Sequence, residues 1–157
     1  GYQHIGFMGG PERATSTQDR YKGFIDEMAL HPQVRVTSSF AEKYSFDAGR
    51  LEMLRLLDGS PAEAYFCGDD VLSIGALSAI QSRDLDVPDD IGLLGLNDME
   101  MAGWENINLT TIHNPIKDIV AASVDVVAAM LTDDKPTLES RVFACHVVER
   151  GTLRPLV

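Results

Sequence analysis

The chain has 157 residues, of which 45% are hydrophobic and 24% are charged. This length and composition are typical of one soluble globular domain that is large enough to bury a sizeable core. The 13 Lys and Arg residues stand against 24 Asp and Glu residues, so the formal net charge is -11. Because such an acidic surface repels phosphate groups, the charge argues against direct binding of this segment to DNA or to an anionic membrane.

The two cysteines, Cys67 and Cys145, cannot build a disulfide framework. We therefore expect the protein to occupy a reducing compartment, the cytoplasm. No apolar run approaches the ~20 residues that a membrane-spanning helix requires, and the start of the chain lacks the pattern of a signal peptide. The His and Cys residues show no metal-ligand spacing, so we expect neither a metal site nor a cofactor.

Strands are predicted where short apolar runs end at turn residues. One such run is followed by Gly68 and two aspartates and leads directly into a helical pattern. In chain order, the predicted strands cover residues 4–8, 34–37, 64–67, 91–96, 109–112 and 142–149.

Helices are predicted between these strands, from apolar residues that recur at spacings of three and four. Ser16 or Thr17 is expected to cap the first helix, and Ser45 the second. The third contains Gly75, whose cost of ~1 kcal/mol relative to alanine indicates close backbone packing on the sheet. A fourth helix is expected over residues 116–131.

Strands that alternate with helices predict a parallel sheet with right-handed crossovers, and nearly continuous apolar strands predict that both faces are covered. The expected fold class is therefore α/β, a Rossmann-like parallel sheet flanked by helices. In such sheets a ligand site lies beyond the carboxyl ends of the strands.

Polar and aromatic residues gather at or just beyond these expected strand ends. They are Arg20, Tyr44, Asp69, Asp70, Asn97 and Asp98. Guanidinium, carboxylate and amide groups suit the vicinal hydroxyls of a sugar or the edge of a purine, and an aromatic ring offers an apolar packing face. The pattern predicts a small-molecule site.

Each candidate also has a purely structural interpretation. Asp69 and Asp70 can cap the helix that follows them, and Asn97 and Asp98 can simply form a turn. Arg20 can make a surface ion pair of little energetic value. The aromatic residues can pack in a loop or in the core; these are Tyr44, Phe46 and Trp104.

Six segments together carry a more specific signal. In order, they are HIGFMGGP (4–11), DRYKGF (19–24), GDDVLSIGA (68–76), VPDDIGLLGLND (87–98), LTTIHNP (109–115) and VERGT (148–152). Each alone is weak. Their order and spacing over essentially the whole chain resemble the LacI/GalR family of bacterial transcriptional regulators.

The resemblance implies an N-terminal helix-turn-helix domain, a hinge helix, and an effector domain of the periplasmic-binding-protein type I, with the ligand held between two α/β lobes. Residues 1–157 are then expected to be the C-terminal lobe, with the DNA-binding domain outside this chain. Residues 116–136 are expected to cross through the absent N-terminal lobe. We therefore expect the helix over residues 116–131 either to pack in a position unlike the family's or to be covered by a neighbouring chain.

The resemblance also implies roles for particular residues. Arg20 would grip ligand hydroxyls or a carboxylate. Asp69 and Asn97 would supply polar contacts from this lobe. Either Tyr44 or Phe46 would pack on the ligand. Asp69 stands where the family frequently has Asn, and Asn97 stands where sugar-binding members often have Asp, so the identity of the ligand does not carry over.

The expected function is ligand sensing and dimerisation in a transcriptional regulator, with a small effector, expected to be a sugar, and with operator DNA bound through another domain. The alternative is a periplasmic sugar-binding protein of a transporter, which shares the fold. A receiver-like phosphoacceptor domain is disfavoured, because Gly9, Gly10, His113 and Asn114 occupy the positions of its acidic pair and lysine. The strand ends carry no nucleophile and base set, so we expect no enzymatic activity.

Overall fold

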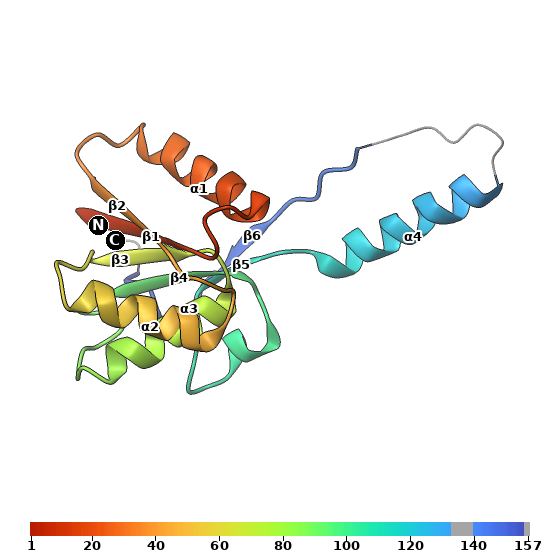
Figure 1. Ribbon diagram of the computed structural model, residues 1–157. Coiled ribbons are helices and arrows are strands. Elements are labelled where there is room, and N and C mark those ends of the chain that lie inside the picture. The colour runs from red at the N-terminus through yellow and green to blue at the C-terminus, as the bar shows by residue number, and fades with distance from the viewer. Residues whose placement is uncertain (133–139, 156–157) are drawn as a thin grey trace.

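A computed structural model gives the structure of the protein and describes residues 1–132 and 140–155. Within these residues the strands form one sheet in the order β2-β1-β3-β4-β5-β6 (Figure 1). Strands β1 to β5 are parallel, and β6 runs antiparallel to β5. The strands are β1 His4–Gly9, β2 Arg35–Phe40, β3 Ala64–Cys67, β4 Gly92–Asn97, β5 Thr111–His113 and β6 His146–Val148.

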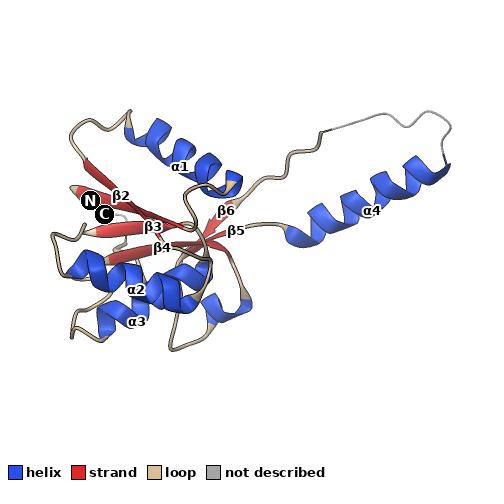
Figure 2. Ribbon diagram, viewed as in Figure 1, coloured by secondary structure: helices blue, strands red, loops and turns tan. Residues whose placement is uncertain are grey.

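Helices lie on both faces of the sheet, with α1 on one side and α2 and α3 on the other, whereas α4 extends away from it (Figures 1 and 2). They are α1 Thr15–Met28, α2 Phe46–Leu57, α3 Asp70–Gln81 and α4 Ile116–Thr132, with a short 3-10 helix η1 at Glu100–Gly103. The predicted α/β class, a sheet flanked by helices, is therefore confirmed.

The last strand differs from the prediction in length and direction. It covers His146–Val148 rather than residues 142–149, because β5 offers only Thr111–His113 for pairing. Val142 is 95% exposed. Helix α4 follows β5 but extends away from the sheet (Figure 1), so it is not the crossover helix that usually joins two parallel neighbours.

Helices α2 and α3 pack against each other through two glycines. A side chain at Gly75 would collide with the backbone carbonyl of Phe46, and one at Gly49 would lie 2.5 Å from the carbonyl oxygen of Leu72. Gly75 therefore serves close packing, as predicted, but against α2 rather than against the sheet. The close approach of the two helices leaves no room for any side chain at these positions.

The α1 face of the sheet is packed by aromatic rings around the fully buried Phe7. The Phe7 ring centroid lies 5.3 Å from that of Tyr21, 5.6 Å from Phe24 and 5.7 Å from Phe66. Such tilted and edge-on contacts add to the apolar area that the rings bury. They hold α1 over β1 and fix the position of the polar residues that α1 carries.

The predicted N-terminal cap is confirmed for α2, where Ser45 caps the helix, but the predicted cap of α1 is wrong. The Ser45 hydroxyl accepts a hydrogen bond from the Ala48 N–H (3.3 Å). Helix α1 begins after Ala14, without a side-chain cap, so neither Ser16 nor Thr17 caps it. Thr17 is fully buried instead, and its hydroxyl is used elsewhere.

Helix α4 has no buried residue. Its apolar stripe, Ile116, Val120, Val124, Val127 and Leu131, is between 51% and 83% exposed. The prediction that this helix packs in a new position is therefore wrong for the described chain, while covering by a neighbouring chain stays a prediction. Residues 133–136 of the expected crossing segment lie outside the described residues.

Candidate functional site

The carboxyl ends of β1, β2, β3 and β4 bring the predicted polar residues to one edge of the sheet. Arg20, in the second turn of α1, donates through Nη1 to the Gly68 carbonyl (2.8 Å) and to the Tyr44 hydroxyl (3.3 Å). Its guanidinium carbon lies 5.9 Å from the centre of the Tyr44 ring. The structure therefore joins the residues that follow β1, β2 and β3 into one cluster.

Asp69 makes the second half of the cluster. Its Oδ1 accepts from the Val71 N–H (2.8 Å), so it caps α3, and its Oδ2 accepts from the Asn97 side-chain amide (2.7 Å). Burial raises the pKa of Asp69, opposed by the Val71 N–H, by the charge of Arg20 and by the Asn97 amide. The Asp69 carboxylate therefore both caps α3 and belongs to the polar cluster.

Asn97 reaches Asp69 because the backbone turns sharply where β4 ends. Asn97 and Asp98 have φ values of 111° and 54°, a region in which Asn and Asp are enriched among residues other than glycine. The turn-forming role expected as an alternative is therefore real, and it directs the Asn97 amide toward β3. The Asn97 side-chain oxygen in turn accepts from the Asn114 amide at 3.5 Å.

Phe46 is the predicted residue that this network does not include. It is the first residue of α2, its side chain is 40% exposed, and its backbone carbonyl abuts Gly75. Of the two aromatic candidates, Tyr44 is therefore the one that contacts Arg20. Trp104, expected to pack, is 50% exposed and follows η1.

Asp70 has a structural role rather than a place in the cluster. It is fully buried, with Oδ1 accepting from the Thr111 hydroxyl (2.5 Å) and Oδ2 from the Met99 N–H (2.7 Å). Burial raises its pKa against these two hydrogen bonds, and the charges of Asp69 and Asp98 act in the same direction as burial. The cap of α3 is Asp69, so Asp70 instead ties α3 to β5 and to the loop after β4.

Sequence reasoning missed two side chains that complete the cluster. The Thr17 hydroxyl lies 2.6 Å from the Tyr44 hydroxyl, which fixes the ring beside Arg20. Asn114 follows β5 directly, so the rule that polar residues gather beyond strand ends would have found it. No comparable signal marks Thr17, because a threonine in the first turn of a helix is most simply explained as part of its start.

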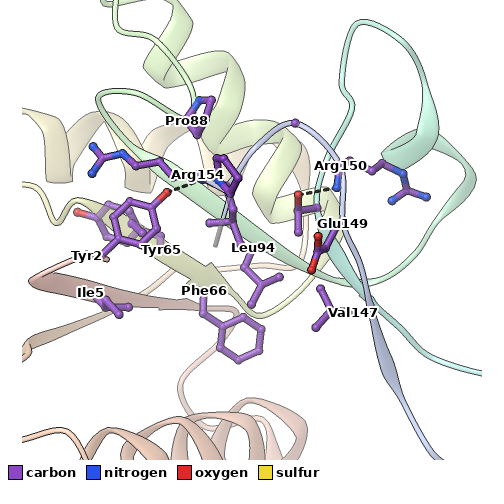
Figure 3. A pocket seen from close by; sticks show the side chains of 15 residues that line it. Tyr2, Ile5, Tyr65, Phe66, Pro88, Leu94, Val147, Glu149, Arg150 and Arg154 are labelled. Atoms are coloured by element: carbon purple, nitrogen blue, oxygen red, sulfur yellow. Dashed lines mark hydrogen bonds between the residues drawn. The ribbon is translucent and has the colours of Figure 1, made fainter. Parts of the chain in front are cut away.

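A separate groove of about 690 Å³ lies on the α1 side of the sheet. In Figure 3 it runs from Tyr2 and Arg154 past Phe66 and Leu94 to Val147. None of Arg20, Tyr44, Phe46, Asp69 and Asn97 lines it. The predicted site and this apolar groove are therefore different surfaces of the molecule.

Two further properties concern the described residues alone. Within 1–132 and 140–155, no group of three or more His, Cys, Asp and Glu side chains could hold a metal ion. None of the helices in that part of the chain is long and apolar enough to cross a membrane.

An α/β lobe with a polar cluster beyond its strand ends is the ligand-binding architecture of open parallel sheets. Residues 1–153 match the family described as "periplasmic binding protein-like domain". The chain belongs to this family, as an effector-binding domain of the LacI/GalR type. The predicted resemblance is therefore confirmed.

Curated relatives agree with this assignment. The chain is 28% identical to the HTH-type transcriptional repressor CytR of Escherichia coli K12, over 99% of this chain and 46% of the relative. It is 30% identical to the ribose operon repressor of the same organism, over 97% of this chain and 47% of the relative. The chain thus spans about half the length of these relatives, which are transcriptional repressors rather than enzymes.

Solved structures give the same fold. A LacI-family transcriptional regulatory protein from Corynebacterium glutamicum matches with a TM-score of 0.87 at 26% identity, over 99% of this chain and 59% of that chain. The lac repressor dimer bound to operator and the anti-inducer ONPF matches with a TM-score of 0.86 at 23% identity, over 98% and 53% of the two chains, and this likeness concerns the fold alone.

Proposed function

We propose that residues 1–157 are the C-terminal lobe of the effector-binding domain of a transcriptional regulator. In this proposal a small molecule, expected to be a sugar, binds at Arg20, Asp69 and Asn97, with Tyr44 or Phe46 against it. The observation that carries the proposal is the convergence of Arg20, Tyr44, Asp69 and Asn97 at one edge of the sheet. The relatives favour this function over the alternative of a transporter's periplasmic binding protein.

The hydrogen-bonding capacity of the cluster supports a polyhydroxylated ligand. Arg20 uses Nη1 within the protein, which leaves its remaining N–H groups as donors in the described chain. Each Asp69 oxygen accepts one hydrogen bond and a carboxylate oxygen can accept a second. Sugar hydroxyls both donate and accept, so adjacent hydroxyls could bridge Arg20 and Asp69.

The exposed stripe of α4 supports the proposed division into lobes. A helix with a continuous apolar face is stable in water when that face is covered. We propose that α4 belongs to a segment that crosses through a second lobe, which covers Val120, Val124 and Val127. The ligand would then lie between the two lobes, and its contacts would favour one relative orientation of them.

Binding would alter operator affinity by a shift of population. A ligand that contacts both lobes in one orientation and fewer groups in another favours the first state by its difference in affinity. Operator DNA would be bound through a domain outside this chain by a dimer in the cytoplasm, since the acidic lobe itself repels phosphate. The coupling would be reciprocal, so operator DNA would change the affinity for the effector by the same factor.

Arg20→Ala in the intact protein tests the proposed site. Loss of charge-assisted hydrogen bonds worth roughly 1.5–3 kcal/mol should weaken effector binding by about 10- to 150-fold. Operator affinity without effector should stay unchanged. Titration calorimetry with D-ribose, then with a panel of pentoses, hexoses and nucleosides, measures the first quantity, and fluorescence anisotropy with the DNA upstream of its own gene measures the second.

The matched control is Arg83→Ala, which removes an exposed guanidinium paired with Asp58 at 2.6 Å and should change neither quantity. An effector titration unchanged by Arg20→Ala would remove Arg20 from the site. An intact wild-type protein that binds neither the DNA nor any member of the panel would contradict the proposed function itself.

A further inference from the structure

The two strands that connect the sheet to α4 lie beside the proposed site. Strand β5 leads out to α4, and β6 brings the chain back (Figure 1). Asn97, at the end of β4, is the register partner of His113, the last residue of β5, and His113 is in turn the partner of His146. Any change at the end of β4 therefore occurs next to the segments through which the chain leaves this lobe.

A single carboxylate joins the end of β4 to both of these strands. Asp98 Oδ1 accepts from Arg150 Nη2 (2.7 Å), and Oδ2 accepts from His113 Nδ1 (3.0 Å). Its side chain is only 18% exposed, so water screens these contacts weakly. Burial raises the pKa of Asp98, but the hydrogen bonds from Arg150 and His113, together with the electrostatic interactions with these two residues, lower it overall.

The two partners of Asp98 lie at opposite ends of β5. Arg150 is anchored, because Nη1 donates to the Leu109 carbonyl (2.8 Å) and its backbone N–H donates to the Thr110 hydroxyl (2.9 Å). His113 is the last residue of β5 and is followed within three residues by α4. One oxygen of Asp98 is thus tied to the body of the lobe and the other to the exit of the chain.

His113 extends the connection to the returning strand. Its ring centroid lies 4.9 Å from that of His146, with an interplanar angle of 35°. The set Asp98, Arg150, His113 and His146, which we name the crossing cluster, therefore includes both strands that connect to α4.

The crossing cluster is one residue away from the proposed ligand contact. Asn97 and Asp98 are consecutive left-handed residues, so their side chains are attached to one strained turn. The Asn97 amide is held by Asp69 at 2.7 Å. Displacement of this amide would therefore act on the same turn that holds the Asp98 carboxylate beside His113.

From this arrangement we propose that Asp98 is a positioning residue that transmits displacement of Asn97 to the crossing strands β5 and β6. The part of the proposal that concerns a ligand rests on the proposed function. The two-state element is the Asp98–His113 contact, which is made or broken while Arg150 keeps its oxygen. In the intact protein this contact sets the direction in which α4 leaves the lobe.

A double-mutant cycle in the 157-residue chain tests the transmission without any ligand. Asn97→Gly removes the amide and suits the φ of 111°. Asp98→Asn keeps the size of the side chain and its tolerance of the left-handed region while it removes the charge. The reporters are the NMR resonances of the His146 ring and of the 146–148 amides, because β6 does not pair with β4.

We expect Asn97→Gly to shift these resonances, and we expect the shift to shrink at least threefold in the Asp98→Asn background. Asp58→Asn is the matched control, since it also removes a carboxylate paired with an arginine but on an exposed surface. A second background, His113→Leu, removes the contact while Asp98 and Arg150 remain. A purely structural Asp98 would give additive shifts.

Equal shifts in the wild-type and Asp98→Asn backgrounds, or no shift of β6 in the wild-type background, would overturn the proposal. Global unfolding of a variant is recognised by the resonances of β1 and β2, and His113→Leu then decides the question. Because the cycle uses no effector and no DNA, its failure is distinct from failure of the proposed function, which the Arg20 titration detects.

Discussion

Helices α3 and α4 are both rich in Ala, Val, Leu and Ile, but they lie in opposite environments. Eight residues of α3 are buried, among them Leu72, Ala76 and Ile80, whereas α4 has none. The difference lies in the partner, because α3 meets both the sheet and a helix shaped to receive it. An apolar sequence shows that a helix face must be buried against another element. Whether that element belongs to the same chain depends on the rest of the structure.

Gly75→Ala should have the largest effect on this comparison, because it forces α3 away from α2. The added methyl would meet the backbone carbonyl of Phe46, which cannot rotate aside. Overpacking of this kind costs up to about 3 kcal/mol, and the helix propensity of alanine returns ~1 kcal/mol. We expect the free energy of unfolding to fall by about 2 kcal/mol, measured from the urea midpoint and slope.

Gly23→Ala is the matched control for this substitution. Gly23 also lies within a helix, α1, but a side chain there would meet nothing within 4 Å. The same substitution should therefore stabilise the protein by ~1 kcal/mol. Equal effects of the two substitutions would show that backbone contact between α2 and α3 does not limit stability.

The contrast between packed and exposed helices also depends on Asp70, which holds the start of α3 to β5. Asp70→Asn should lower the free energy of unfolding by about 1–2 kcal/mol, because the single side-chain oxygen of asparagine can accept from only one of the two donors, the Thr111 hydroxyl or the Met99 N–H. Burial raises the pKa of Asp70, so the folded state binds its proton more tightly than the unfolded state. The contribution of this residue to stability therefore increases as the pH falls through the folded pKa.

The stability deficit of Asp70→Asn should consequently widen as the pH is lowered from neutral. Asp98→Asn should behave oppositely, because the pKa of Asp98 is lowered and its contribution is lost as the pH falls through the folded pKa. Urea titrations of wild type and both variants between neutral and acidic pH measure the two deficits. Parallel pH dependences for the two variants would contradict the assigned environments.

The sequence is sufficient for the five parallel strands, for α2 and α3, and for four of the residues that form the polar cluster, but not for the length and direction of β6. These predictions succeed because buried parallel strands are apolar runs, and because polar residues that follow them meet at one edge of the sheet. Arg20, Tyr44, Asp69 and Asn97 follow this rule directly. Their contact with a ligand stays a prediction.

Other features depend on contacts between distant segments, which local patterns do not record. The sequence predicts only that Thr17 lies at the start of a helix. Its contact with Tyr44 depends on how α1 packs over the sheet. The cost of a glycine within a helix predicts close packing at Gly75, but the element that approaches it, α2, is determined by the tertiary structure. Helix α4 is exposed because no other element of the described chain packs against it. The spacing of apolar residues within the helix cannot predict whether such an element is present.

Val124→Ala on α4 should have the smallest effect on the stability of the 157-residue chain. It tests whether a second lobe buries the apolar stripe of α4 in the intact protein. Val124 is 61% exposed, so in the 157-residue chain the free energy of unfolding should change by less than about 0.5 kcal/mol. In the intact protein, burial against a second lobe would make the same truncation cost more than about 1 kcal/mol through lost apolar area and a cavity. Val142→Ala, at a site 95% exposed outside any helix, should be neutral in both. Chemical denaturation of the 157-residue chain and of the intact protein measures both effects. If Val124→Ala is neutral in the intact protein as well, α4 is exposed there too, which would contradict its proposed passage through the second lobe.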